Sequence, residues 1–216
     1  AEASGDDGDA LRDAVLERLG DGLQFWRAFF GRGGGDHALV VVDDLRGGNA
    51  ASFAGLTVLK KSTLARGLDR WCVGHGARDG ACLALFRSLC LEDLDLGDVD
   101  DGWLLDGAAG YLLTRYVERS RGADEHRRLL RRLAEAALAL ERDGVDAPLR
   151  FSADETETDA ALRAHGPRGA PERRVCAAPL ALHALEPLVG GRGRLREVLG
   201  EVLAPRDPRA GPATTP

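Results

Sequence analysis

Lysine is nearly absent from this sequence, and methionine is wholly absent. Among its 29 lysines and arginines only Lys60 and Lys61 are lysines. A preference for arginine of this kind indicates the codon usage of a GC-rich genome, so a cluster of arginines does not by itself predict a binding patch. The four cysteines have no repeated spacing and lie mostly in apolar surroundings, which predicts buried thiols. They are Cys72, Cys82, Cys90 and Cys176.

Long apolar runs are absent as well. Runs such as Ala38–Val42 are far shorter than the roughly 20 residues that a helix needs to cross a bilayer, so we expect no membrane span. Residues 1–7 carry acidic side chains where a secretory signal has a basic region and an apolar run. These absences predict a cytoplasmic protein, or a nuclear one if the source is eukaryotic or viral.

The overall charge is negative and disfavours one class of partner. The chain has a net charge of −6 at pH 7, whereas a nucleic-acid-binding domain normally carries a basic surface that neutralises phosphates. We therefore expect no general nucleic-acid binding.

The composition is that of a globular chain. Hydrophobic residues make up 44% and charged residues 30% of the 216 residues, close to the values of folded domains. We predict a single, mainly helical domain over residues 1–204, with a mobile loop at 164–174 where glycine and proline interrupt regular structure. Residues 205–216 contain prolines but no large apolar side chain, so they are expected to form a disordered tail.

The spacing of apolar residues predicts mainly helical structure. Between Asp9 and Phe30 they recur at three- and four-residue steps, the pattern of an amphipathic helix. The run Ala38–Val42 is short and β-branched, which favours a strand. Further helices are expected over residues 81–91, 103–118, 126–141, 175–188 and 194–203, with an interruption at Pro179. The predicted fold is a mainly α, compact multi-helix domain with a small strand element near residues 38–59, and an α+β fold is the alternative.

Part of the first predicted helix resembles the BH3 helix of apoptosis regulators. Leu16, Leu19 and Leu23 match three of its spaced apolar anchors, and Asp21 matches its acidic residue, while Arg12 stands at the fourth anchor position. The resemblance implies a helix that lies in a groove of a protein partner. The alternative is an ordinary helix whose leucines face the core of this protein.

The helix expected over residues 126–141 has one apolar side and one basic side. Arg127, Arg128 and Arg131 lie opposite its leucines, and Arg119 precedes them in the chain. This face suits an acidic partner or phosphate groups. Arginine also fills solvated helix faces in a chain that uses so little lysine, and this second interpretation stays open.

A short glycine-rich segment combines a thiol and an imidazole. In Trp71–Gly76 the side chains of Cys72 and His75 are three residues apart, a spacing compatible with a metal site or a nucleophile pair. Together with Asp106–Gly110, this segment resembles short elements of the lanthionine cyclase family, which implies a zinc enzyme. Two ligands do not complete the three-residue set of a catalytic zinc site. We therefore predict no metal and no cofactor.

Amphipathic helices are visible in this sequence, whereas a complete set of catalytic residues is not. We expect a non-enzymatic protein-interaction or regulatory protein with a protein partner, a viral accessory or host-interacting factor being one form of it. The alternative is a zinc- or thiol-dependent enzyme centred on Cys72 and His75. The candidate partner-binding residues are Leu16, Leu19, Asp21, Leu23, Arg127, Arg128 and Arg131.

Overall fold

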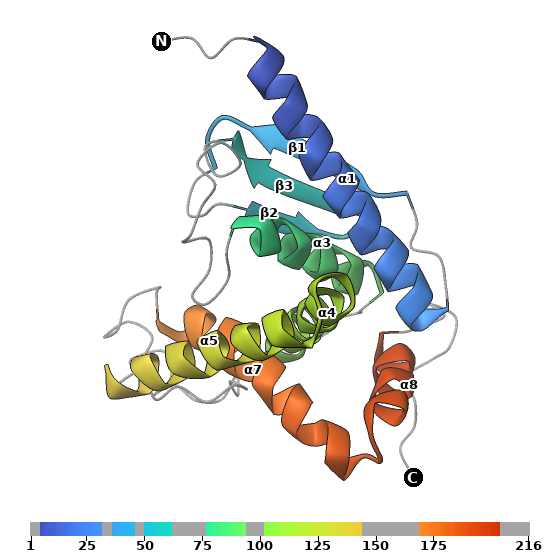
Figure 1. The fold of residues 1–216 in the computed structure, drawn as a ribbon, viewed down its shortest axis with the longest axis vertical. Coiled ribbons are helices and arrows are strands. Elements are labelled where there is room, and N and C mark those ends of the chain that lie inside the picture. The colour runs from blue at the N-terminus through green and yellow to red at the C-terminus, as the bar shows by residue number, and fades with distance from the viewer. Residues whose placement is uncertain are drawn as a thin grey trace, which may run out of the picture.

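Helices make up most of the structure, and three short strands form a small sheet (Figure 1). The computed structural model describes residues 5–31, 36–45, 50–61, 77–93, 102–143 and 169–203. Within these ranges the elements are α1 (Gly5–Phe30), β1 (Ala38–Val42), β2 (Ala50–Phe53), β3 (Leu56–Lys60), α3 (Ala77–Asp93), α4 (Gly102–Arg121), α5 (Ala123–Arg142), α7 (Gly169–Leu188) and α8 (Arg192–Val202). The predicted fold class, mainly α with a small strand element near residues 38–59, is confirmed.

The three strands form a mixed sheet in the order β1-β3-β2. β3 pairs in parallel with β1 and antiparallel with β2, where Ser52 lies opposite Thr57. Because alternate residues of a strand face opposite sides, Thr57 and Leu59 share one side of the sheet, and both are buried. Helix α3 packs on this side, where the Ser52 hydroxyl donates a 2.9 Å hydrogen bond to the carbonyl oxygen of Ala84.

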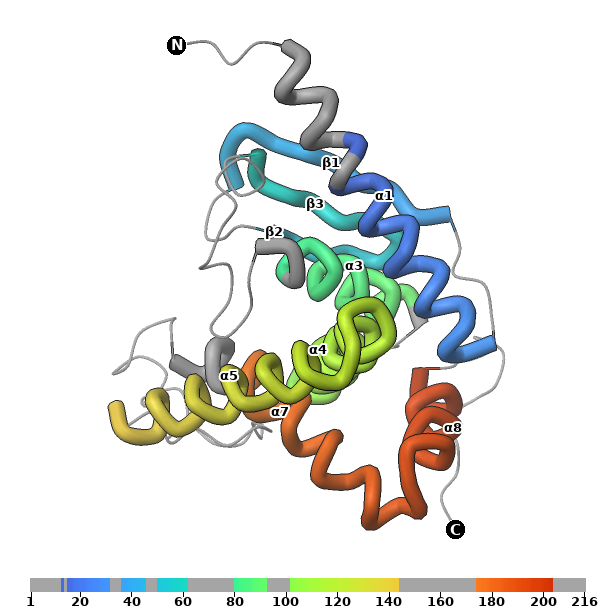
Figure 2. Tube along the Cα trace, viewed as in Figure 1, coloured from blue at the N-terminus to red at the C-terminus, as the bar shows by residue number. Residues whose placement is uncertain are grey.

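Helix α4 lies at the centre of the core. Its residues 105–117 are all buried, and it packs against α1, α3, α5 and α7. Figure 2 shows its trace between those of α3 and α7. The stretch Gly107–Gly110 contains only glycine and alanine, and such small residues let the backbones of neighbouring helices approach closely.

Helices α4 and α7 approach each other closely. A Cβ atom on Gly110 would lie 2.2 Å from Cγ of Pro179, so the proline ring occupies the space that a side chain would need. The sequence predicted an interruption of the helix at Pro179, but α7 continues through it. Proline removes one backbone donor and disturbs the preceding turn, and the close packing of its ring against Gly110 offsets part of that cost.

The start of α7 also differs from the prediction. A mobile loop was expected at 164–174, yet the helix begins at Gly169, and residues 164–168 lie outside the described ranges. Pro171 is compatible with this start because the first turn of a helix tolerates proline, whose missing N–H has no intrahelical partner there.

Helix α1 is attached to the core by aromatic side chains, as its apolar spacing predicted. Leu19, Phe25 and Trp26 are buried. The ring of Phe25 lies 5.8 Å from that of Phe86 on α3 and 5.7 Å from that of Tyr116 on α4. These separations are typical of favourable aromatic pairs, so the carboxyl-terminal half of α1 is fixed against both helices.

A single glycine joins α4 to α5. Gly122 is the only residue between them, and its φ of 88° lies in the left-handed region that glycine adopts without strain. On α5, Leu129 and Leu133 are buried, while α8 buries Leu195 and Leu199, one helical turn apart. Helices α5 and α8 thus each bury one stripe of leucine side chains in the core.

The remaining expectations from the sequence concern the cysteines, the tail and the membrane. Cys82, Cys90 and Cys176 are buried, as predicted. Cys72 and residues 205–216 are not among the described residues. Among the described helices, none combines the length and the apolar character that a bilayer crossing requires.

Replacing Gly110 with alanine is expected to destabilise the protein. The added Cβ atom would collide with the Pro179 ring, and overpacking of this kind costs about 1–3 kcal/mol. In α1, Gly20 has no atom within 4 Å of a built Cβ, so Gly20→Ala is the matched control and should gain up to about 1 kcal/mol from helix propensity. Urea unfolding measures both changes. Equal stability of the two variants would contradict the close approach of α4 and α7.

Candidate functional site

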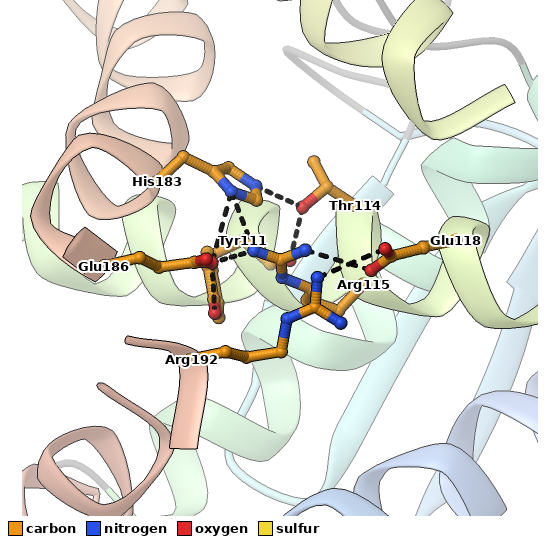
Figure 3. A network of polar contacts seen from close by, with 7 residues as sticks. All are labelled: Tyr111, Thr114, Arg115, Glu118, His183, Glu186 and Arg192. Carbon is orange, nitrogen blue, oxygen red and sulfur yellow. Dashed lines mark hydrogen bonds and ion pairs between the residues drawn. The ribbon is translucent and has the colours of Figure 1, made fainter. Parts of the chain in front are cut away.

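A buried arginine on α4 organises the polar groups of the helical core (Figure 3). The Arg115 side chain is only 5% exposed and forms ion pairs with Glu118, at 2.9 Å, and with Glu186 on α7. Removing a guanidinium from water costs several kcal/mol unless it is paired. The two carboxylates therefore allow Arg115 to lie within an otherwise apolar stretch of α4.

His183 on α7 completes this network as a neutral ring. Its Nδ1 accepts a 3.1 Å hydrogen bond from Arg115, because a guanidinium can only donate. The ring proton is then on Nε2, which donates to the Thr114 hydroxyl at 2.6 Å, and that hydroxyl donates to the carbonyl oxygen of Tyr111 at 2.7 Å. Burial, reinforced by the charge of Arg115, lowers the pKa of His183 to about 3. Its 3.4 Å separation from Glu186 is consequently a contact with a neutral ring and not an ion pair.

Glu118 connects this network to α8. One carboxylate oxygen accepts from Arg115 at 2.9 Å and the other accepts from Arg192 at 3.1 Å. Burial disfavours the charge of Glu118, but the two arginines outweigh this effect and lower the pKa of the carboxyl. Figure 3 shows Arg192 reaching Glu118 from α8. One carboxylate thus binds a buried arginine and a surface arginine.

A pocket opens beside this shared carboxylate, between α1, α4 and α8. Its volume is about 460 Å³. One wall is apolar and comes from α1, and the other two are mostly basic. The lining residues are Phe25, Ala28 and Phe29 from α1, Arg115, Glu118 and Arg119 from α4, and Arg192, Gly193 and Arg196 from α8. We call this feature the arginine pocket.

The arginine pocket has an excess of positive charge. Four arginines line it against one carboxylate, and two of them are already bound to Glu118. Arg119 and Arg196 are exposed and make no hydrogen bond or ion pair within the described part of the chain. Two guanidinium groups are therefore available for an anionic ligand.

The first turn of α8 adds further donors. The first backbone N–H groups of a helix have no intrahelical partner, and Gly191, which precedes α8, has no side chain that could accept a hydrogen bond from them. Arg192 and Gly193, the first two residues of the helix, line the pocket, and the helix dipole places partial positive charge there. Nε of the buried Arg115 also lacks a hydrogen-bond partner among the described residues. Each of these features favours an anion over a neutral ligand.

The predicted anchors on α1 have different surroundings. Leu16 is 49% exposed, whereas Leu19 is 5% exposed and belongs to the core. Leu23 is partly buried, and Asp21 is exposed. The three leucines therefore do not form one free apolar stripe in this structure, which agrees with the alternative of a core-facing helix.

The predicted basic residues on α5 are all exposed. Arg127 pairs with Asp124 and Arg128 pairs with Glu125, each within one turn of the helix, and Arg131 is exposed as well. In Figure 1, α5 lies far from α1. The structure therefore does not bring the two predicted sets of partner-binding residues together.

The predicted thiol and imidazole pair cannot be placed. Cys72 and His75 lie outside the described residues. Within the described ranges, no group of three or more histidines, cysteines and acids could hold a metal ion. The segment Asp106–Gly110 lies inside α4, which begins four residues earlier, and Asp106 is 3.1 Å from Arg87. Burial raises the pKa of this aspartate, although Arg87 and Arg174 act against the shift.

Sequence reasoning missed most of the arginine pocket. Its residues come from three helices that are distant in the sequence, and Arg192 and Arg196 had no distinguishing pattern. One signal was present: Arg115 interrupts a stretch of apolar residues in α4 and has Glu118 one turn later. A charged residue at such a position predicts a buried ion pair.

The sequence matches none of the protein families compared with it, and none of the curated proteins. A proposal for the function therefore rests on the geometry of the site.

Replacing His183 with glutamine is expected to weaken the pH dependence of stability. The histidine has a pKa of about 3 in the folded protein and about 6.5 in the unfolded chain. Between these two values the unfolded chain binds a proton at this histidine and the folded protein does not. The neutral His183 ring therefore contributes its full stabilisation above about pH 6.5, and this stabilisation is lost as the pH falls towards 3. The slope is up to about 1.4 kcal/mol per pH unit.

Urea unfolding of both proteins at several values between about pH 6.5 and pH 5 measures this difference, since most carboxylates stay ionised there. The glutamine variant should lose most of the slope that His183 contributes. Identical slopes would mean that folding does not lower the pKa of His183, which would contradict its burial as a neutral ring.

A second pair of variants tests the position of α1. Leu19→Ala should cost about 2–5 kcal/mol because it leaves a cavity in the core, whereas Leu16→Ala, at a half-exposed position, should change stability by about 0.5 kcal/mol or less. Denaturant midpoints give both values. If Leu19→Ala is as stable as the parent, α1 does not pack as described, and the BH3-like interpretation becomes the better one.

Proposed function

We propose that the protein is a non-enzymatic protein-interaction module that binds an acidic segment of a protein partner in the arginine pocket. The carrying observation is that two guanidinium groups at the edge of a partly apolar pocket, Arg119 and Arg196, have no partner among the described residues. Arginine holds carboxylates and phosphates through two parallel hydrogen bonds, and it is enriched at the centres of protein interfaces.

The shape of the surface favours a polypeptide as the ligand. A second cavity of about 530 Å³ shares Ala28, Phe29 and Arg196 with the arginine pocket. It continues along α1 and α8 and includes Phe30 and Gly200. An elongated groove with aromatic residues along one wall fits a chain segment with alternating apolar and charged side chains better than a small, compact anion.

The charge distribution also supports a protein partner. Basic residues line one end of the groove, whereas Glu197 and Glu201 line the other end. A nucleic acid presents negative charge along its whole length, so it would meet repulsion at the acidic end. The net charge of the chain, −6, acts in the same direction.

A regulatory role is part of this proposal. The described helices supply a rigid site for recognition, and the proposed activity is binding itself. The enzyme alternative depends on Cys72 and His75, which lie outside the described residues, so no observation of the site favours it.

Removing the two unpaired arginines should weaken binding of an acidic peptide. A fluorescein-labelled hexaglutamate peptide serves as the probe, and fluorescence anisotropy gives its Kd for the full chain at low salt. The double variant Arg119→Ala/Arg196→Ala should bind about tenfold more weakly, the equivalent of about 1.4 kcal/mol. Raising the salt concentration should weaken binding of the parent because exposed charges are screened.

The double variant Arg127→Ala/Arg131→Ala removes the same charge from α5 and separates the two basic surfaces. It should bind the peptide as the parent does. A loss in this variant alone would move the site to the basic face of α5, and equal binding by all three proteins would overturn the proposal.

A further inference from the structure

The donors around the arginine pocket converge from different directions. Arg119 comes from α4, while Arg192 and Arg196 come from α8, together with the uncapped amides at the start of that helix. A planar carboxylate has two oxygens and a single charge, so it engages one guanidinium well. A phosphate monoester has three acceptor oxygens in a tetrahedral arrangement and a charge of about −1.5 to −2 at pH 7.

The number of available charges also favours a dianion. Arg119 and Arg196 have no partner among the described residues, so a dianion would neutralise both, whereas a single carboxylate would leave one of them uncompensated. Glu118 is the one acid among the described residues that line the pocket, and its bonds to Arg115 and Arg192 reduce its repulsion of a ligand.

The guanidinium of Arg115 is held in place before any ligand binds. It is fixed by Glu118 and Glu186, and its Nε has no hydrogen-bond partner within the ranges that the structure describes. Arg192 is fixed by the same Glu118. Donors that are already positioned lose little conformational entropy on binding, which increases affinity.

The far end of the groove restricts the source of the phosphate. The Glu201 side chain lines that end, and its carboxylate forms no hydrogen bond or ion pair within the described part of the chain, although Arg194 lies near enough to interact with it electrostatically. A lipid surface or a polyphosphate would place further negative charge beside it. A phosphorylated side chain on a polypeptide can instead be followed by a basic residue that pairs with Glu201.

We infer that the arginine pocket recognises a phosphorylated side chain of a protein partner, with a basic residue of the same segment near Glu201. This inference rests on the proposed function, because it specifies the ligand of the same groove. The apolar wall formed by Phe25, Ala28 and Phe29 contacts the residues that flank the phosphate.

Degenerate peptide libraries test this inference with the immobilised full chain. One pool carries a central phosphoserine, phosphothreonine or phosphotyrosine, and matched pools carry serine or glutamate there. The phosphorylated pool should be retained at least about tenfold more than the glutamate pool, since hydrogen bonds to charged groups add to the second charge. Sequencing of the retained peptides should show lysine or arginine at one flanking position.

Three variants locate the interaction. Arg119→Ala/Arg196→Ala should remove the preference for phosphate, and Glu201→Gln should remove the preference for the basic flanking residue without removing the preference for phosphate. The double variant Arg127→Ala/Arg131→Ala is the matched control because it removes the same number of charges from exposed positions on α5, and neither residue lines the pocket or the adjoining cavity. This control should retain peptides as the parent does.

The outcomes separate this inference from the proposed function. Equal retention of the phosphorylated and glutamate pools would overturn the inference and leave the proposed function in place. Failure to retain any acidic pool would overturn both. Binding to phosphatidylcholine vesicles that contain a phosphoinositide, lost in the double arginine variant and without phosphopeptide retention, would assign the phosphate to a lipid and overturn the inference.

Discussion

The burial of one guanidinium group determines how the carboxyl-terminal helices are arranged. Arg115 lies in the continuously buried stretch of α4, where an unpaired charge would cost more than most single contacts contribute. Its partners come from its own helix and from α7, and Glu118 extends the connection to α8. Any packing of α7 and α8 that removed these carboxylates would leave the charge uncompensated, so the ion pairs select one arrangement among the many that apolar surfaces alone would permit.

Close packing of α4 against α7 supports this arrangement as well. The absence of a side chain at Gly110 allows the ring of Pro179 to approach the α4 backbone, and this closeness brings α7 within reach of Arg115. The small residues of α4 and its buried charge therefore have complementary effects: the glycines bring the helices together, and the ion pairs fix their relative rotation and position.

Much of the fold followed from local patterns, but the site did not. The apolar steps in α1 and the β-branched run in β1 predicted their elements because each signal lies within one segment. The continuation of α7 through Pro179 was not predictable, because it depends on Gly110 in another helix. The arginine pocket depends in the same way on Arg119 and Arg196, which come together only when α4 and α8 pack near α1. In a chain that uses arginine almost everywhere, composition does not distinguish these two residues from the paired ones on α5.

Because two arginines share Glu118, a change in one of its ion pairs affects the other. A carboxylate that binds Arg115 and Arg192 at the same time cannot strengthen one of these bonds without changing the electrostatic potential at the other. An anion beside Arg192 competes with Glu118 for that guanidinium. The carboxylate of Glu118 is then less neutralised by Arg192 and attracts Arg115 more strongly. By thermodynamic reciprocity, any rearrangement that tightens the contact between Glu118 and Arg115 changes the affinity for the anion by the same factor. Binding of an anion in the arginine pocket and the contact between Glu118 and Arg115 in the interior are therefore thermodynamically coupled.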